Sequence, residues 1–91
     1  MSVTVRIPTP LRRVTNGQDK VSVDGAVLND VITSLDARFP GIKERLCDES
    51  GELRNFVNVY INGEDVRFLD GLTTPTKSGD EVSIVPAVAG G

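Results

Sequence analysis

The feature that most constrains this fold is one helical pattern set among short segments that alternate with period two. Apolar residues recur at spacings of mostly three and four over residues 28–39, and Pro40-Gly41 then stops the pattern. The apolar stripe consists of Leu28, Val31, Ile32, Leu35 and Phe39. Because a single helix can cover only one face of one sheet, the pattern predicts an α+β domain.

Five short segments around this helix have the composition of β-strands. They are residues 2–7 and 20–23 before the helix, and residues 56–61, 66–68 and 81–85 after it. Residues 62–65, Asn-Gly-Glu-Asp, predict a tight hairpin turn, and Ile42 and Leu46 predict one further helical turn. The last strand reaches the first only after the helix crosses over. This order, β-β-α-β-β-β, is that of the β-grasp or ubiquitin-like fold: a mixed β-sheet covered on one face by one α-helix.

Composition narrows the classes of function. With 91 residues the chain is predicted to be a single domain, residues 1–91. A net charge of −3 and the lack of a basic stripe argue against a nucleic-acid partner. The sequence has no histidine and one cysteine, Cys47, so a disulfide within the chain and a four-cysteine metal site are both excluded. Cys47 is interpreted as a partly buried small apolar residue, and no metal site is predicted.

The chain offers no candidate for a membrane span. No apolar run approaches the roughly 18 residues that a span needs, and residues 1–6 lack the charged and apolar regions of a signal peptide. We therefore expect a cytoplasmic protein without a membrane partner.

The last seven residues carry the predicted site. They read Val-Pro-Ala-Val-Ala-Gly-Gly, and Pro86 ends the strand ladder. The residues beyond it are small and finally lack side chains, which predicts a flexible tail over about 86–91. Two terminal glycines alone are a weak signal, and the alternative is an ordinary frayed end, but after a β-grasp pattern they indicate that the carboxylate of Gly91 is the working group.

The chemistry of such an end explains its residue types. A terminal carboxylate has a pKa of about 3.5 and is ionised at neutral pH, so it must be activated before it can donate an acyl group. Activation as an acyl adenylate consumes ATP, and a side chain at Gly90 or Gly91 would hinder entry into the nucleotide site. Attack by a sulfur nucleophile then gives a terminal thiocarboxylate. The chain supplies no catalytic side chain, so we predict a carrier without a bound cofactor rather than an enzyme.

Three segments resemble the MoaD/ThiS family of ubiquitin-like sulfur carriers. They are residues 3–8, residues 56–67, and residues 78–91 with their Gly-Asp-Glu-Val start and Gly-Gly end. Within that family the tail and residues 62–68 are most similar to the carriers that serve cysteine biosynthesis. Many small subunits of molybdopterin synthase have Pro-Pro where this chain has Pro86-Ala87, which makes a molybdopterin role a weaker alternative.

The resemblance implies a set of partner enzymes. A ubiquitin-activating-type adenylyltransferase/sulfurtransferase would use ATP to charge Gly91 and would recognise Val88, Ala89 and Gly90. A PLP-dependent cysteine synthase would accept the sulfur, and a metallopeptidase, with zinc as its expected metal, would release cysteine. Those cofactors belong to the partners. Arg6, Asn58, Tyr60, Phe68 and Val85 are candidates for a partner-docking face on the side of the sheet away from the helix, and the alternative is a set of scattered surface residues.

Other functions remain open at the level of sequence. The sulfur acceptor could instead belong to molybdopterin, thiamin, thiolated-tRNA or secondary-metabolite synthesis. The chain could also be a protein modifier, joined to lysines through Gly91, because conjugation needs the same adenylation. A third alternative is an interaction domain whose tail has no role.

Overall fold

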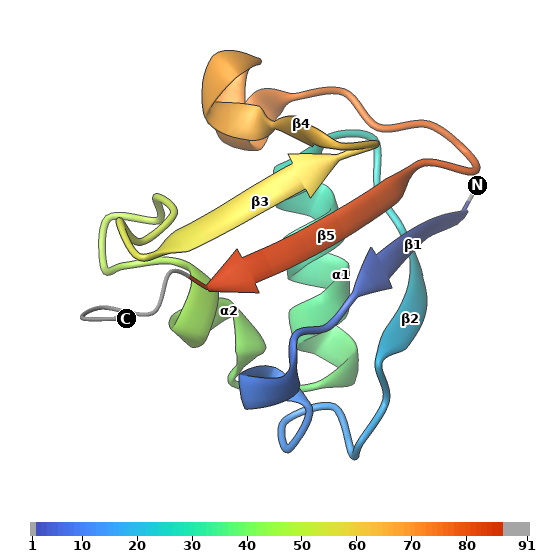
Figure 1. The fold of residues 1–91 in the computed structure, drawn as a ribbon, viewed down its shortest axis with the longest axis vertical. Coiled ribbons are helices and arrows are strands. Elements are labelled where there is room, and N and C mark those ends of the chain that lie inside the picture. The colour runs from blue at the N-terminus through green and yellow to red at the C-terminus, as the bar shows by residue number, and fades with distance from the viewer. Residues whose placement is uncertain (1, 87–91) are drawn as a thin grey trace.

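Five strands form one mixed sheet in the computed structural model of this protein, which describes residues 2–86 (Figure 1). The strands are β1 (Ser2–Arg6), β2 (Lys20–Asp24), β3 (Val57–Ile61), β4 (Glu64–Asp65) and β5 (Glu81–Pro86). Their order across the sheet is β2-β1-β5-β3-β4. Only β1 and β5 pair in parallel, and the three other pairs are antiparallel. The predicted mixed sheet, with the last strand beside the first, is confirmed.

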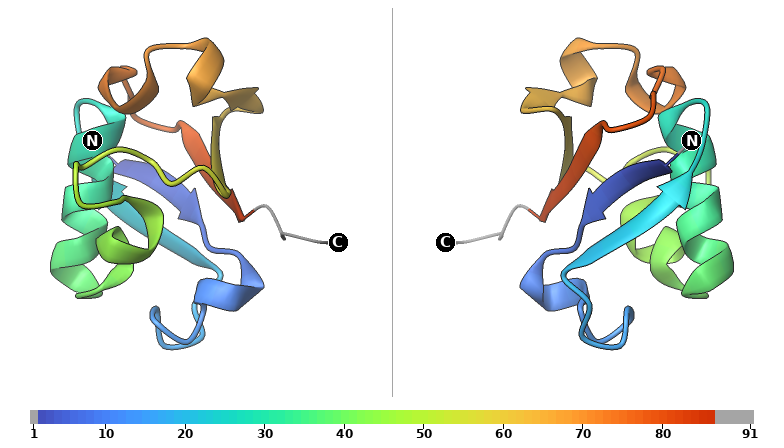
Figure 2. Two further views of the ribbon diagram at one scale, coloured as in Figure 1. Left: turned by 90° about the vertical axis from the view of Figure 1, so that its left-hand side faces the viewer. Right: turned by 90° about the vertical axis from the view of Figure 1, so that its right-hand side faces the viewer.

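Two helices lie on the same side of the sheet (Figure 2). They are α1 (Leu28–Arg38) and the short α2 (Ile42–Leu46). The single predicted helix is therefore followed by a second, five-residue helix where one further turn was expected. Asp36 links the two, because its Oδ1 accepts hydrogen bonds of 3.1 Å from the N–H groups of Gly41 and Lys43. A carboxylate at this helix start also interacts favourably with the free N–H groups.

The start of α1 is capped by another part of the chain. The N-cap residue, Val27, has no side chain that can accept a hydrogen bond. Instead the Leu28 N–H donates to the carbonyl oxygen of Thr74 at 3.0 Å, and Val27 forms an isolated β-bridge with Pro75. The long segment between β4 and β5 thus satisfies a helix end that the local sequence leaves open.

The core lies between the sheet and α1. Alternate residues of each long strand are buried, as the period-two pattern predicts, and all five residues of the helical stripe are buried with them. Among residues 2–86 the longest helix, α1, has 11 residues, and no helix there is long and apolar enough to cross a membrane.

One predicted strand is wrong. Residues 66–68 form a 3₁₀ helix, η2 (Val66–Phe68), and the strand that pairs with β3 is only Glu64–Asp65. The Asn-Gly turn is tighter than expected, since Asn62 and Gly63 both have positive φ, 51° and 88°, and Ile61 pairs directly with Glu64. Strand pairing then stops because the Asp65 side chain accepts a hydrogen bond from the Arg67 N–H at 2.9 Å, which favours a helical turn. Two further 3₁₀ turns are η1 (Thr9–Leu11) and η3 (Gly71–Thr73).

Candidate functional site

The end of β5 is where the chain leaves the sheet toward its predicted working end. Val85 and Pro86 are the last two residues of β5, and they pair with Asn58 and Val57 at the start of β3. The predicted charging site Gly91 and the predicted recognition residues Val88, Ala89 and Gly90 lie outside the described residues. The described part of the site is the end of β5 and the strand residues that pair with it.

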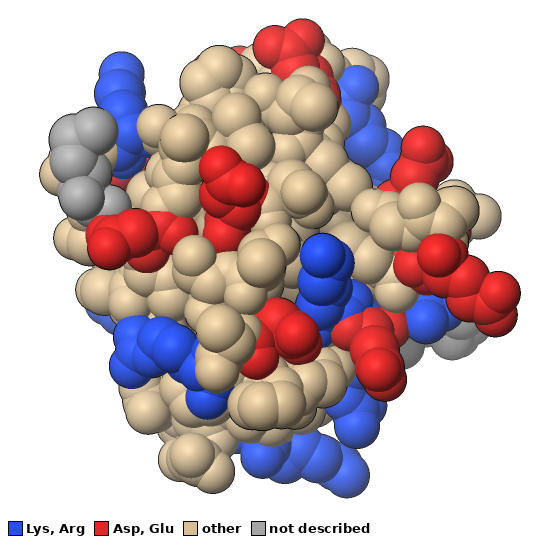
Figure 3. All heavy atoms as spheres, turned by 180° about the vertical axis from the view of Figure 1, so that it is seen from behind, with Lys and Arg blue, Asp and Glu red and all other residues tan. Residues whose placement is uncertain are grey.

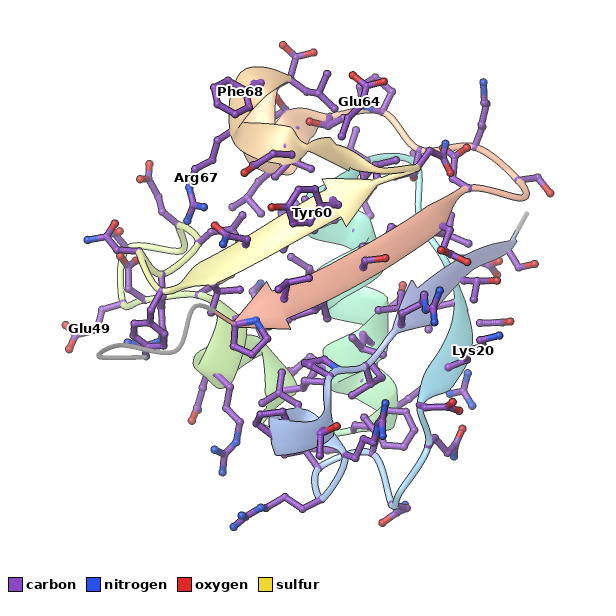
Figure 4. The ribbon with its side chains drawn as sticks, viewed as in Figure 1. Lys20, Glu49, Tyr60, Glu64, Arg67 and Phe68 are labelled. Atoms are coloured by element: carbon purple, nitrogen blue, oxygen red, sulfur yellow. The ribbon has the colours of Figure 1, made fainter. Side chains whose placement is uncertain are left out.

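The predicted docking residues of the strands share one face of the sheet. Arg6 and Tyr60 both pair with Ser83, and Asn58 pairs with Val85, so the strand register places all four candidates on the side opposite α1. Their neighbours along each strand are buried, except Pro86 beside Val85, whereas these side chains are partly or largely exposed. Tyr60 lies over β3 on the side that faces the viewer in Figure 4.

Phe68 extends this face beyond the sheet. It lies in η2, not in a strand, and its side chain is 87% exposed. It projects outward above β3 and β4 in Figure 4. Val85 is 44% exposed and Phe56, in the turn before β3, is 50% exposed. Exposed aromatic and apolar side chains beside polar ones are typical of a surface that meets another protein.

Arg67 is a part of this region that the sequence analysis missed. Its Nη1 donates to Asn58 Oδ1 at 2.6 Å, and its Nη2 donates to the carbonyl oxygens of Val57 at 2.8 Å and Arg54 at 3.0 Å. The guanidinium thus holds the start of β3 from outside the sheet (Figure 4). Two of its acceptors are backbone carbonyl oxygens, which every residue has. The sequence therefore contained no direct signal for this cluster.

The charges around the outer face are of mixed sign. Arg6 pairs with Glu81 at 3.5 Å, but both side chains are about half exposed, so this pair contributes little to stability. On the opposite face of the molecule, acidic and basic side chains are interspersed (Figure 3).

Cys47 is not built for nucleophilic chemistry. It is buried at the end of α2, and burial raises the pKa of its thiol, although nearby Lys43 acts in the opposite direction. A thiol of raised pKa holds little of the reactive thiolate at neutral pH. Its interpretation as a small apolar residue is confirmed by its place in the core. Within residues 2–86 there is also no group of three histidine, cysteine or acidic side chains that could hold a metal ion.

Comparisons with known proteins place this geometry in a family. The model of the ThiS family matches residues 5–91. The sulfur carrier protein CysO of Mycobacterium tuberculosis is 56% identical over 93 aligned residues, which cover the whole of both chains. The crystal structure of the Amycolatopsis orientalis BexX/CysO complex contains a chain with a TM-score of 0.93 and 49% identity, covering 98% of this chain and 99% of that one. Small archaeal modifier protein 3 of Haloferax volcanii is 47% identical over 68 residues, 75% of this chain and 73% of that one.

The mixed five-stranded sheet and the helix across one face define a ubiquitin-like β-grasp protein. The fold class predicted from the sequence is thereby confirmed, with two helices in place of one. The chain belongs to the ThiS family, because the family model covers all but its first four residues. The resemblance to sulfur carriers drawn from residues 3–8, 56–67 and 78–91 is confirmed by the same match.

Proposed function

We propose that this chain is a sulfur carrier whose C-terminal Gly91 is charged by a partner enzyme and then donates sulfur, most simply for cysteine biosynthesis. The observation that carries the proposal is the full-length match to a protein named as a sulfur carrier, at 56% identity. The fold adds a physical reason. A rigid sheet presents one outer face, and β5 ends at the edge of that face with Val85 and Pro86.

The proposed charging reaction uses the terminal carboxylate as its only reacting group on this chain. The Gly91 carboxylate attacks the α-phosphorus of ATP, pyrophosphate leaves, and an acyl adenylate forms. A persulfide on the partner then attacks the acyl carbon and displaces AMP. A second thiolate of the partner cleaves the S–S bond of the resulting acyl disulfide, which leaves a terminal thiocarboxylate on the carrier and a disulfide on the partner. The carrier contributes the carboxylate and a recognition surface, while the enzyme contributes ATP binding and catalysis.

The partners are part of the proposal. An adenylyltransferase/sulfurtransferase would read the outer face and residues 88–91, and a PLP-dependent cysteine synthase would take the sulfur. A metallopeptidase with zinc would then free cysteine and regenerate Gly91. The BexX/CysO complex supports partner binding in general, because its CysO chain shares this fold at a TM-score of 0.93.

A protein-modifier role is the second candidate, and one observation favours it. Small archaeal modifier protein 3 is 47% identical over 75% of this chain. Both roles begin with adenylation of the same carboxylate, so they diverge only at the acceptor: a sulfur nucleophile in one and a lysine amine in the other.

Intact mass spectrometry of the protein from its native host tests these proposals. We expect a free form in which sulfur replaces one terminal oxygen, and we expect that form to vanish in a Gly91→Ala variant and in a chain extended by one residue. Lys20→Ala, on the far edge strand, is the control and should be charged normally. Conjugates that carry Gly91 in an isopeptide bond would favour the modifier, and normal charging of Gly91→Ala would refute the proposed site.

A further inference from the structure

Arg67 joins η2 to the start of β3, and the proposed function needs these two parts to keep a fixed position relative to each other. We propose that Arg67 is a positioning residue for the charging of Gly91, an inference that rests on the proposed function. Its guanidinium ties η2, which carries Phe68, to the start of β3, which faces the end of β5. The role is to hold the base of the C-terminal segment in register with the outer face.

The hydrogen bonds of the guanidinium converge on the first residues of β3. The Val57 N–H donates to the Arg54 carbonyl oxygen at 3.0 Å, which closes the turn that leads into the strand. Arg67 Nη2 shares that carbonyl oxygen and also bonds that of Val57, while Nη1 bonds the Asn58 side chain. One planar group therefore fixes the turn, the first strand residue and the second strand residue together.

These same strand residues pair with the last described residues of the chain. Val57 pairs with Pro86, and Asn58 pairs with Val85. The Val57–Pro86 pair is the last pair of the β3–β5 ladder among residues 2–86, so no further strand pair supports this end. A strand end held by few ladder bonds frays readily, and an external clamp on β3 opposes that fraying.

A local hydrogen bond holds the backbone of Arg67. The Arg67 N–H donates to Asp65 Oδ1 at 2.9 Å, which anchors η2 next to the Asn62-Gly63 turn. The next residue, Phe68, is 87% exposed. Arg67 is itself exposed and lies outside the core, so its loss should change the relation between β3, β5 and Phe68 without unfolding the domain.

The geometry also separates arginine from lysine. Three acceptors spaced around one planar fork suit a guanidinium with two terminal nitrogens, whereas a lysine ammonium is a single point with a different direction of donation. Replacement of Arg67 by lysine keeps the positive charge at this surface but loses the set of three hydrogen bonds to the start of β3 and the turn before it. This difference provides a test of positioning against simple charge contact.

The test is steady-state adenylation of purified Arg67→Ala and Arg67→Lys carriers by the host's activating enzyme, followed as pyrophosphate release. We expect kcat to fall about tenfold in both variants with KM changed by less than a factor of about two, because small misplacement of a reacting group lowers the rate. Amide hydrogen exchange, which needs no enzyme, should speed up at residues 57–60 and stay unchanged at residues 3–5. Arg38→Ala is the matched control, because it removes one arginine-to-carbonyl bond, to Ser22 at 2.7 Å, on β2.

Each outcome decides the question. A kcat equal to that of the wild type in both variants would overturn the positioning role, and so would an effect confined to KM that lysine restores, which would mark a charge contact. Unfolding of both variants, measured by thermal melting, would also overturn it in favour of a purely structural role. Failure of the wild type itself to be charged would instead refute the proposed function, so the two proposals fail separately.

Discussion

Asp80 shows at the scale of one residue how this fold uses a buried carboxylate. Its side chain accepts hydrogen bonds from Asn62 Nδ2 at 3.0 Å and from the Lys77 N–H at 2.9 Å, and the residue is only 6% exposed. Asn62 in turn accepts from the Glu81 N–H at 3.0 Å. The cluster thereby joins the β3–β4 turn to the first residue of β5, and the Asp80 carbonyl extends it to β1 through the Thr4 N–H.

The pKa of Asp80 has a direct consequence for stability. The side-chain hydrogen bond from Asn62, followed by that from the Lys77 N–H, lowers the pKa of this carboxyl below its usual value. A lowered pKa in the folded state stabilises the fold above the unfolded-state pKa of about 3.9. That stabilisation is lost as the pH falls from there through the folded-state pKa.

We expect Asp80→Asn to lower the free energy of unfolding by about 1–2 kcal/mol at neutral pH. An amide has one acceptor oxygen, and its NH₂ group would face a donor from Asn62 or Lys77. The difference from the wild type should shrink as the pH falls below the unfolded-state pKa of about 3.9 and through the lowered folded-state pKa, where the wild-type carboxyl also becomes protonated. Urea unfolding at several pH values measures both the loss of stability and its pH dependence, with Asp70→Asn at an exposed position as the control. A difference that stays constant down to low pH would contradict this account.

At the scale of elements, helix α1 begins without a Ser, Thr, Asp or Asn at its N-cap, the residues that helix starts prefer. Val27 occupies the N-cap with extended backbone angles of φ −134° and ψ 166°, the conformation in which Ser or Thr would cap the helix. The Thr74 carbonyl satisfies the Leu28 N–H, yet the two following N–H groups gain nothing from Val27. The helix is thus held mainly by its buried face and by the segment around Pro75.

A better cap should therefore stabilise the whole domain. Val27→Thr keeps the β-branched shape and adds a hydroxyl oxygen that can accept from the N–H of Asn29 or Asp30. We expect the free energy of unfolding to rise by about 0.5–1 kcal/mol, measured by urea denaturation. Val27→Ala is the control and should be destabilising, because it removes apolar contact without adding an acceptor. Equal stabilities for the threonine variant and the wild type would mean that the contacts with Thr74 and Pro75 already stabilise the helix start as well as a capping hydroxyl would.

The sequence predicted elements wherever burial alone dictated the pattern. Strands such as Ser2–Arg6 and Val57–Ile61 alternate buried and exposed residues, and α1 buries one stripe, so periodicity located them within a residue or two. It failed at Val66–Phe68, because a hydrogen bond from the Arg67 N–H to the Asp65 side chain outweighed the strand pattern. It also missed the Arg67 cluster, since the acceptor carbonyls belong to the tertiary arrangement. Gly91 was predicted from its residue type and remains a prediction, as it lies outside residues 2–86.

At the scale of the whole molecule, the sheet separates two different surfaces. One face carries both helices and the core, while the other presents Arg6, Asn58, Tyr60 and Val85. The chain reaches the end of β5 at the rim of this outer face. A partner that binds the outer face would therefore lie close to the base of the C-terminal segment, which is what charging of Gly91 requires.

Phe68 gives this arrangement its sharpest test, because its side chain is almost wholly exposed and packs little within the domain. Phe68→Ala should change the free energy of unfolding by less than about 0.5 kcal/mol. Its affinity for the activating enzyme should fall about tenfold or more, as expected for an aromatic side chain that becomes buried in an interface. Isothermal titration calorimetry with the uncharged carrier measures this loss, and Lys20→Ala, on the distant edge strand β2, should bind like the wild type. If Phe68→Ala binds within twofold of the wild type, the docking face does not extend to η2, and only the sheet residues remain candidates.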